Sequence, residues 1–276
     1  MIMIVLENKD YYKAIEPLSY VGINTLFAEA VVEQRILGKI YVDSVQEPTA
    51  FYVAHPYGMS LLFGNSDNEQ FNRDLYEYIN NQESNIRKSE WLQVDPAGTW
   101  ADKIDSMTTQ LNEQQIIMKN TRVNFSFNLE TYHQMKEQLR HHDHEIIQMT
   151  KDMFLSQTGG VIPRYFWRDV DQFLAVGMGY SLVCEGEIAS TAFSAFRNEH
   201  QLEIGIETAE AHYGKGYALS VCSALIEYCL DHQLEPVWAC RLDNEGSYKP
   251  AQRLGFEPTL NIPYYRLECR GSIDSN

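Results

Sequence analysis

The sequence predicts an α+β fold, with helices on a mixed sheet, arranged in two halves. The chain has 276 residues, of which 44% are apolar, and this is enough for one or two hydrophobic cores. Short β-rich stretches bounded by turn residues recur in both halves. In the second half an amphipathic helix separates two such stretches, as a crossover helix does between parallel strands.

Residues 1–127 are expected to form the smaller α/β domain. The apolar residues 1–6 are typical of a first strand or helix start, and no basic residues precede them as in a signal peptide. Apolar residues at helical spacing predict a helix near 22–35, and Gly38 ends it. The further elements expected are strands at 39–45, 50–55, 59–63 and 91–94, and helices near 70–80 and 100–107.

Residues 128–157 are expected to form a helical joint. The stretch 130–139 has a helical pattern, and a second helical stretch is expected through Ile146 and Met153. Between them, His141, His142 and His144 surround Asp143, which suggests either a metal site or a solvated polar segment. Because no second ligand cluster is evident, we expect a polar segment and no metal.

Residues 158–276 give the clearest pattern. A helix at 168–176 precedes three strands at 180–184, 188–196 and 202–208, whose short turns predict antiparallel pairing. Apolar residues between Ala218 and Cys229 recur at the spacing of one helix face. A strand at 236–242, a helix at 247–254 that stops at Gly255, and a closing strand at 264–269 complete this half.

The charge balance excludes some classes of function. The formal net charge is −16, and a nucleic-acid-binding protein needs a basic surface instead. An acidic surface favours a cationic partner weakly, although it can also serve solubility alone. No stretch approaches the ~20 apolar residues of a membrane span. The five cysteines form no CxxC pair, so we expect reduced thiols in the cytoplasm, without a zinc site or a disulfide framework.

The segment 202–218 carries the chemistry. A strand runs into a loop with Gly214 and Gly216, and the amphipathic helix starts immediately afterwards. Glycines in such a loop let backbone N–H groups face one anion, and the helix N-terminus adds its own donors. A nucleotide P-loop requires Ser or Thr after Gly-Lys, but Gly216 follows Lys215. A Rossmann fingerprint requires a third glycine. The loop is therefore either a pyrophosphate cradle of another type or only a tight turn before the helix.

This segment resembles the phosphate loop of the GNAT acyl-CoA N-acyltransferases, commonly Gln/Arg-x-x-Gly-x-Gly/Ala. Downstream, Asn244, Ser247 and the run 254–256 (Leu-Gly-Phe) resemble the family's Asn-x-x-Ala/Ser and its Gly-Phe ending. The wider text over 165–257 is similar to a bacterial branch that includes zwittermicin-resistance acetyltransferases. The resemblance in the first half rests on residues 38–65 and implies a degenerate GNAT-like domain without a phosphate loop.

The resemblance implies an acetyl-CoA-dependent N-acetyltransferase, with acetyl-CoA as co-substrate and no metal. The amine of a small molecule would attack the thioester directly while both are bound. The alternative is a GNAT-shaped CoA-binding or sensor module with little or no catalysis. We expect no nucleic-acid or membrane partner, and a homodimer is left open.

Specific residues follow from the resemblance. The cofactor would contact Ile206, Thr208, Tyr213, Gly214, Lys215, Gly216, Tyr217, Ala218, Asn244 and Ser247. A backbone N–H near Thr208 would hold the oxyanion, and Ser247 is a further catalytic candidate. Glu203 and Glu207 lie four apart on one strand, so both face one side, and either one is a candidate general base or part of a solvated face. Asn244 has an alternative role as a turn or N-cap residue.

Two positions depart from the family pattern. Ala211 lies where the family often has Gln or Arg, so one side-chain contact to the pyrophosphate is lost. Ala251 lies where many members carry a tyrosine proposed to protonate the leaving thiolate. The acid would then be Tyr248, Ser247 or water, or none would be needed.

Overall fold

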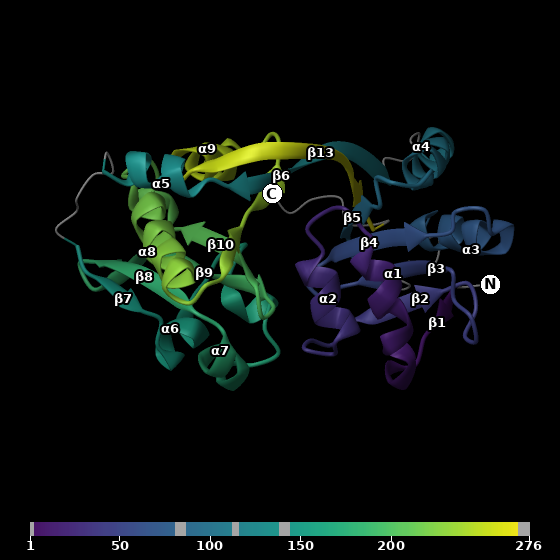
Figure 1. Ribbon diagram of the computed structural model, residues 1–276, viewed down its shortest axis with the longest axis horizontal. Coiled ribbons are helices and arrows are strands. Elements are labelled where there is room, and N and C mark those ends of the chain that lie inside the picture. Colours follow the sequence, from purple (N-terminus) through teal and green to yellow (C-terminus); the bar gives the residue numbers. More distant parts are fainter. Residues whose placement is uncertain (1–2, 81–86, 112–115, 138–143, 270–276) are drawn as a thin grey trace. The chain divides into compact units, whose positions relative to one another are not determined.

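The computed structural model describes residues 3–80, 87–111, 116–137 and 144–269 (Figure 1). By internal packing the chain divides into two compact units. Unit 1 comprises the described residues of Met1–Arg122 and Asn261–Asn276, and unit 2 comprises those of Val123–Leu260. Strands β6 (Ile117–Phe127) and β13 (Phe256–Leu267) each have residues in both units. The domain boundaries expected from the sequence, 1–127, 128–157 and 158–276, stay a prediction.

Unit 1 follows the sequence pattern closely. Its strands are β1 (Ile4–Val5), β2 (Lys39–Val42), β3 (Ala50–Ala54), β4 (Met59–Gly64) and β5 (Glu90–Val94). Its helices are the 3₁₀ helix η1 (Asn8–Ala14), then α1 (Ile15–Ser19), α2 (Leu26–Val32), α3 (Glu69–Asn80) and α4 (Trp100–Leu111). The strand order is β1-β2-β3-β4-β5-β13, and β6 and β12 follow β13. Strands β4 and β5 pair in parallel because α3 crosses between them, whereas the pairs β1–β2, β2–β3, β3–β4 and β5–β13 are antiparallel.

A buried carboxylate organises the aromatic core of unit 1. Glu90 is 7% exposed, and it accepts hydrogen bonds from the hydroxyls of Tyr52 and Tyr78, each at 2.5 Å. The ring of Tyr41 packs against both tyrosine rings. Since hydroxyl donors replace the water around the carboxylate, part of the cost of burying Glu90 is offset.

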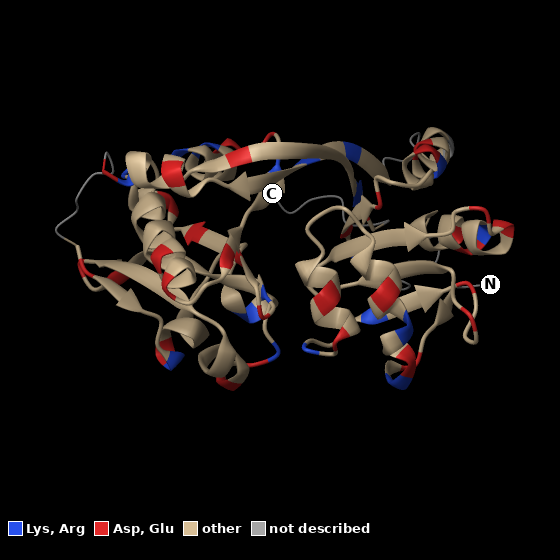
Figure 2. Ribbon diagram, in the orientation of Figure 1, with Lys and Arg blue, Asp and Glu red and all other residues tan. Residues whose placement is uncertain are grey.

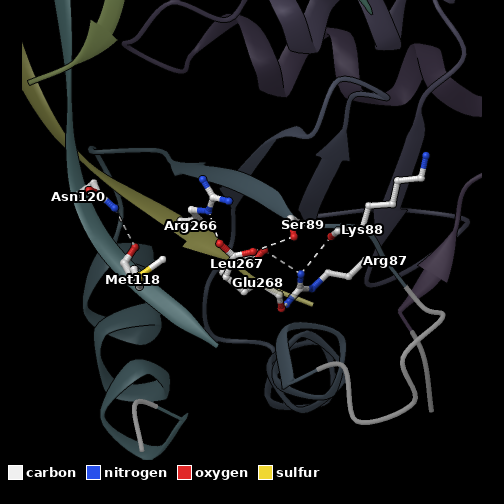
Figure 3. A network of polar contacts seen from close by, with 8 residues as sticks. All are labelled: Arg87, Lys88, Ser89, Met118, Asn120, Arg266, Leu267 and Glu268. Carbon is white, nitrogen blue, oxygen red and sulfur yellow. Dashed lines mark hydrogen bonds and ion pairs between the residues drawn. The ribbon is translucent and has the colours of Figure 1, made fainter. Parts of the chain in front are cut away.

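A buried guanidinium links three segments of the same unit by hydrogen bonds (Figure 3). Arg87 is 7% exposed and donates to backbone carbonyls that come from the end of α3, from its own segment and from the end of the chain. These are the carbonyls of Tyr78 (3.2 Å), Ile79 (2.7 Å), Lys88 (3.1 Å), Leu267 (3.1 Å) and Glu268 (3.0 Å). Ser89 Oγ also donates to Glu268 Oε2 at 2.9 Å, so the end of β13 is tied to the segment that leads into β5.

Unit 2 contains the second sheet, in the order β11-β10-β9-β8-β7. Its strands are β7 (Ile146–Gln148), β8 (Gly179–Cys184), β9 (Glu187–Arg197), β10 (Gln201–Thr208) and β11 (Glu235–Val237), and β12 (Ala239–Arg241) belongs to the other sheet. Its helices are α5 (Leu129–Lys136), α6 (Lys151–Ser156), η3 (Pro163–Tyr165), α7 (Val170–Val176), η4 (Glu210–His212), α8 (Tyr217–Asp231) and α9 (Glu245–Arg253). Neighbouring strands from β7 to β10 pair antiparallel. Strand β10 pairs in parallel with β11, and the crossover helix α8 connects the two strands. The predicted α+β fold is confirmed.

The two faces of this sheet are covered differently. Helix α8 packs on one face through apolar residues that include Val221, Leu225 and Ile226, all fully buried (Figure 1). Aromatic rings from α6, α7 and the segment between them pack together on the other face, where Phe166 contacts Phe193 of β9. A sheet covered on both faces explains why β9 is buried almost throughout.

Two expected elements were wrong. The helix expected through Ile146 and Met153 is strand β7 followed by the short helix α6. Ile146 pairs with Leu182 of β8, and Thr150 starts α6 by accepting a hydrogen bond from Met153 N at 3.3 Å. The single strand expected at 236–242 is two strands, which separate at Trp238 and join different sheets.

The rest of the expected joint is described in part. Helix α5 lies within the expected stretch 130–139 except for its first residue, and residues 138–139 lie outside the described part of the chain, as do His141, His142 and Asp143. Among the described residues, no group of three or more His, Cys, Asp or Glu is placed to hold a metal ion. No helix within the described ranges is long and apolar enough to cross a membrane.

Candidate functional site

The sheet of unit 2 opens beside β10. Strand β10 pairs with β11 through only three residue pairs, the last of which is Glu203 with Val237. Strand β10 continues to Thr208, but β11 ends at Val237 and the chain turns at Trp238 into β12, which belongs to the other sheet. Among the described residues, no strand therefore pairs with residues 204–208 on that edge, and their backbone borders an opening.

A β-bulge lies at the start of this opening. Glu203 is opposite Phe196, but the next residue, Ile204, is opposite Ser194, so Ala195 of β9 is the extra residue. A bulge bends the strand that carries it and increases the local twist, so β9 bends at this point. Because the extra residue is on β9, the alternation along β10 is kept, and Glu203 and Glu207 face the same side as expected.

The loop after β10 presents backbone donors. Gly214 and Gly216 have positive φ angles of 73° and 88°, and Gly216 precedes α8 in the left-handed conformation. Its carbonyl oxygen accepts from Leu219 N at 3.1 Å. Within the described part of the chain, the amides of Gly214, Lys215, Gly216 and Ala218 have no recorded partner. Open amides at the start of a 15-residue helix suit an anion, since the helix dipole adds positive potential there.

The surroundings of these amides suit a pyrophosphate. A Cβ built on Gly214 would meet no atom within 4 Å, so the space in front of the loop is open. The ammonium of Lys215 lies 3.1 Å from His212 Nδ1 and 6.0 Å from the centre of the Tyr217 ring. The residues of the loop therefore fit the phosphates of a CoA thioester through main-chain donors and one cation.

Tyr217 differs from the other predicted loop residues. Its side chain is 7% exposed and belongs to the core cluster, and its hydroxyl lies 2.9 Å from His144 Nε2. Of His141, His142 and His144, the structure describes only His144, which anchors the start of α8. The side chain of Tyr217 is thus part of the core, whereas the side chain of Tyr213 is 64% exposed.

Asn244 and Ser247 lie at the start of α9. The carbonyl oxygen of Asn244 accepts from Ser247 N at 3.0 Å and from Tyr248 N at 2.8 Å, but its side chain makes no cap hydrogen bond. Asn244 is therefore the N-cap residue of α9, the alternative left open above, but it caps the helix through its carbonyl oxygen and not through its side chain. Ser247 Oγ accepts from Trp238 Nε1 at 3.0 Å, so Ser247 fastens α9 to the residue where β11 and β12 separate.

Position 251, where many members of the family carry a tyrosine, has no free space around it. Ala251 is fully buried in the core of unit 2, and a larger side chain there would require repacking. The ring of Tyr248 packs edge-on against Phe125, with 5.3 Å between ring centres. A proton donor at position 251 is therefore excluded by packing, and the assignment of the acid to Tyr248, Ser247 or water stays open.

The two glutamates of β10 differ in their surroundings. Glu203 is 5% exposed and lies where the pairing with β11 ends. Glu207 is half-buried, and its Oε2 accepts from Val161 N at 2.6 Å. The close approach requires Gly159, where a Cβ would lie 2.8 Å from Glu207 Cδ. Their shared face is confirmed, and their roles in catalysis stay predictions.

A pocket of about 800 Å³ adjoins the end of β10 within unit 2. Of the predicted site residues, Glu207, Thr208 and Tyr213 line it, whereas residues 214–218, Asn244 and Ser247 do not. Thr208 Oγ1 lies 2.8 Å from Ser190 Oγ in its wall. The sequence analysis did not find Gln157, which also lines the pocket, because a glutamine after a short helix carries no motif.

Comparisons with known proteins agree with this geometry. The family model described as GNAT acetyltransferase matches residues 20–265. The chain belongs to this family. The match extends over most of both units, so the likeness is not confined to the phosphate-loop half.

Individual relatives are distant in sequence. An uncharacterised N-acetyltransferase of Bacillus subtilis, YdfB, is 23% identical over 245 residues, which cover 87% of this chain and 89% of that protein. A GCN5-related N-acetyltransferase-like protein from Streptococcus suis has a TM-score of 0.71 at 21% identity, with 95% of this chain and 100% of that chain covered. A tandem GNAT protein from the clavulanic acid biosynthesis pathway has a TM-score of 0.59 at 11% identity, with 96% and 98% covered. These likenesses show the GNAT fold, and together with the family match they identify the chain as an N-acyltransferase.

Proposed function

We propose that this chain transfers an acetyl group from acetyl-CoA to the amine of a small molecule, by direct attack with both substrates bound. One observation carries the proposal: the open amides of Gly214, Lys215, Gly216 and Ala218 follow a strand edge, residues 204–208, that has no partner among the described strands. The loop would bind the pyrophosphate of CoA, and the opening beside β10 would hold the thioester arm. In this proposal Asn244, whose side chain makes no cap hydrogen bond, would contact that arm.

The reaction transfers an acyl group between sulfur and nitrogen. The amine nitrogen forms a bond with the carbonyl carbon, the carbon–sulfur bond breaks, and the sulfur leaves with its electron pair and is protonated to the thiol. The chain contributes the alignment of the two substrates and a backbone N–H near Thr208 to stabilise the oxyanion. Bound acetyl-CoA supplies the activated acyl group.

An ammonium substrate must lose one proton before it attacks and a second after the bond forms. Glu203 and Glu207 face one side of β10, and each is a candidate to accept the first proton directly or through water. Glu207 lies on the pocket wall, and Glu203 lies where the opening begins. The leaving thiolate would take its proton from Tyr248, Ser247 or water, because position 251 is closed.

Paired substitutions at Gly214 test the phosphate loop. Asn tolerates a positive φ better than most residues, so Gly214→Asn measures the effect of adding an uncharged side chain. Gly214→Asp adds a side chain of the same size that also carries a negative charge. We expect Gly214→Asp to bind CoA at least about tenfold more weakly than Gly214→Asn, through charge repulsion. Isothermal titration calorimetry with CoA gives both affinities, and equal affinities would place the phosphates elsewhere.

Substitutions of the two glutamates test the base. If Glu207 accepts the proton, Glu207→Gln lowers kcat/KM by about 10²-fold near neutral pH and much less at high pH, where the free amine is abundant. Glu203→Gln gives the same profile if Glu203 is the base. A thiol-release assay across pH measures both, and a loss that does not depend on pH in either variant would argue against a base on β10.

The closed position 251 favours a second candidate function, a CoA-binding sensor with little or no turnover. Such a sensor would bind acetyl-CoA in the calorimeter, yet release no thiol with any amine. The two functions are therefore separated by the same thiol-release assay.

A further inference from the structure

The carboxylate of Glu207 is held at one oxygen and accessible at the other. Its Oε2 accepts a hydrogen bond from Val161 N at 2.6 Å, a short distance that is typical of a charge-assisted bond. Its Oε1 has no hydrogen-bond partner among the described residues and is not fully buried. Acidic residues are distributed over both units (Figure 2), so these contacts, and not charge alone, distinguish Glu207.

The close approach of the two segments depends on Gly159. Its φ angle of +139° lies in a region that residues with a side chain rarely adopt. A Cβ at this position would lie 2.8 Å from Cδ, 2.9 Å from Cγ and 3.0 Å from Oε2 of Glu207, so a side chain here would displace the carboxylate. At the next residue, Gly160, a Cβ would meet no atom within 4 Å. The requirement for glycine is therefore specific to position 159.

The segment that carries these groups is fastened at other points as well. Gln157 is 7% exposed, and its Nε2 donates to Thr191 Oγ1 of β9 at 2.5 Å. Arg164 donates to the carbonyl oxygens of Leu155 at 2.8 Å and of Gln157 at 2.6 Å, so it ties the residues that follow the turn to the end of α6. These contacts limit the positions that Val161 N can take, and a donor that is itself held can fix the group that it binds.

The held carboxylate belongs to the wall of the pocket at the end of β10. Glu207 lines this pocket together with Gly159 and Thr208, whereas Glu203 does not line it and is 5% exposed. Under the proposed function, the oxyanion would be held near Thr208, so the amine must approach close to this residue. Glu207 is therefore better placed than Glu203 to take a proton from an amine in the pocket.

Resting on the proposed function, we infer that Gly159 and Val161 are positioning residues, which fix Oε2 of Glu207 so that Oε1 meets the acceptor nitrogen. The ammonium proton passes to Oε1, directly or through water, and the electron pair that stays on nitrogen forms the bond to the carbonyl carbon. Glu207 then releases the proton to solvent. Because a displacement of about 1 Å can cost about 10²-fold in rate, a side chain at position 159 lowers turnover even where both substrates still bind.

Alanine at the two neighbouring glycines tests the inference. Gly159→Ala places a methyl group against Glu207, and Gly160→Ala is the matched control, because it adds the same group to open space. We expect Gly159→Ala to lower kcat at least about tenfold near neutral pH, and much less at high pH, where the free amine is abundant. The KM for acetyl-CoA should not change, and Gly160→Ala should change neither quantity. A thiol-release assay across pH, with ethanolamine, benzylamine and lysine as acceptors, gives these values.

The same substitution in a chain without the base separates positioning from strain. Glu207→Gln keeps the size of the side chain, so Gly159→Ala still brings the strained φ angle and the close contact, but no base remains to be displaced. In that background we expect Gly159→Ala to lower kcat further by less than about twofold, because residues that act together are not additive. An equal loss in both backgrounds would overturn the inference, since the turn would then act through strain alone.

The remaining outcomes keep this inference distinct from the proposed function. Thiol release that Gly159→Ala does not lower would overturn the inference and leave N-acetylation standing. If circular dichroism shows that Gly159→Ala does not fold, Val161→Pro takes its place, because proline has no N–H to donate. An unchanged kcat in Val161→Pro would overturn the inference in the same way. Absence of thiol release from the unmodified chain with every amine tested would overturn both.

Discussion

His55 is a histidine whose environment keeps it neutral. It is 3% exposed at the end of β3, and its Nδ1 accepts from Tyr57 N at 3.1 Å. Burial lowers the pKa of His55 from 6.5 to about 3. The unfolded chain therefore binds a proton at His55 at a much higher pH than the folded protein does.

This shift makes the stability of unit 1 depend on pH. Above pH 6.5 His55 is mostly neutral in both the folded and the unfolded state, so it does not reduce the free energy of unfolding. As the pH drops from 6.5 towards 3, the free energy of unfolding falls, because the unfolded state binds the proton first. Between pH 7 and 5 the loss from this group is about 2 kcal/mol. His55→Asn keeps an acceptor near Tyr57 N without a titrating group. Urea unfolding at both pH values should show a smaller loss for this variant, and an equal loss would contradict the assignment.

The sequence alone could predict only those features of the site that do not depend on side-chain contacts between distant residues. Gly214, Gly216 and the glutamates of β10 were found because a loop between a strand and a helix has a recognisable pattern. Gln157 was not found, since its importance depends on contacts with Thr191 of another element. The burial of the Tyr217 side chain was also not evident, because its partner His144 lies 73 residues away.

Among the elements, the β8–β9 hairpin has a turn with an unfavourable residue. Cys184 pairs with Glu187, so Glu185 and Gly186 form a two-residue loop, with positive φ angles of 53° and 86°. Both angles are typical of a type I′ turn, for which Asn-Gly is preferred. Glutamate has a Cβ and no short polar group to offset this conformation.

Replacing this glutamate should stabilise the protein. We expect Glu185→Asn to raise the free energy of unfolding by about 0.5–1 kcal/mol, because Asn tolerates the left-handed region better. Glu199→Asn makes the same chemical change in the next hairpin, where φ is not positive, and should have a smaller effect. Denaturant unfolding of both variants measures the difference, and a destabilised Glu185→Asn would contradict the explanation.

Strands and helices were predicted well where turn residues surround them. Strands β3, β4 and β5 lie within a residue or two of their expected bounds, because Pro48 and Gly58 mark the turns. Strand β2 ends at Val42 rather than 45, β6 was not expected, and β13 begins at Phe256 rather than at 264. The stretch 146–148 was misread, since Ile146 and Ile147 fit a helix face as well as a short edge strand. The division at Trp238 could not be read from local sequence, because it arises where one run of residues joins two sheets.

In the whole molecule, residues from both ends of the sequence pack into the same unit. The last strand returns to unit 1, where Tyr264–Leu267 of β13 pair with β5. Tyr265 and Leu267 are fully buried in the core of that unit. Arg87 in turn uses the carbonyls of Leu267 and Glu268. Residues near the C-terminus thus complete the unit that the N-terminal residues begin.

Truncation tests this dependence. A chain that ends at Leu260 loses most of β13, four buried side chains (Ile262, Tyr264, Tyr265 and Leu267) and two partners of a buried guanidinium. Together these losses destabilise unit 1 by at least about 5 kcal/mol. Since that is comparable with the whole stability of a domain, unit 1 should not fold. A chain that ends at Cys269 keeps these contacts and is the control. Limited proteolysis should cleave residues 3–122 rapidly only in the shorter chain, and equal resistance would contradict the prediction.

The opening beside β10 has a consequence for how this enzyme can change over evolution. Under the proposed function, the amides of the 214–218 loop and the unpaired strand edge recognise the acyl donor through atoms that every residue except proline possesses. Mutation can then alter most side chains around the donor without removing the groups that bind it. Such tolerance is compatible with the 23% identity to the Bacillus subtilis relative, and it leaves the side chains elsewhere around the site free to diverge.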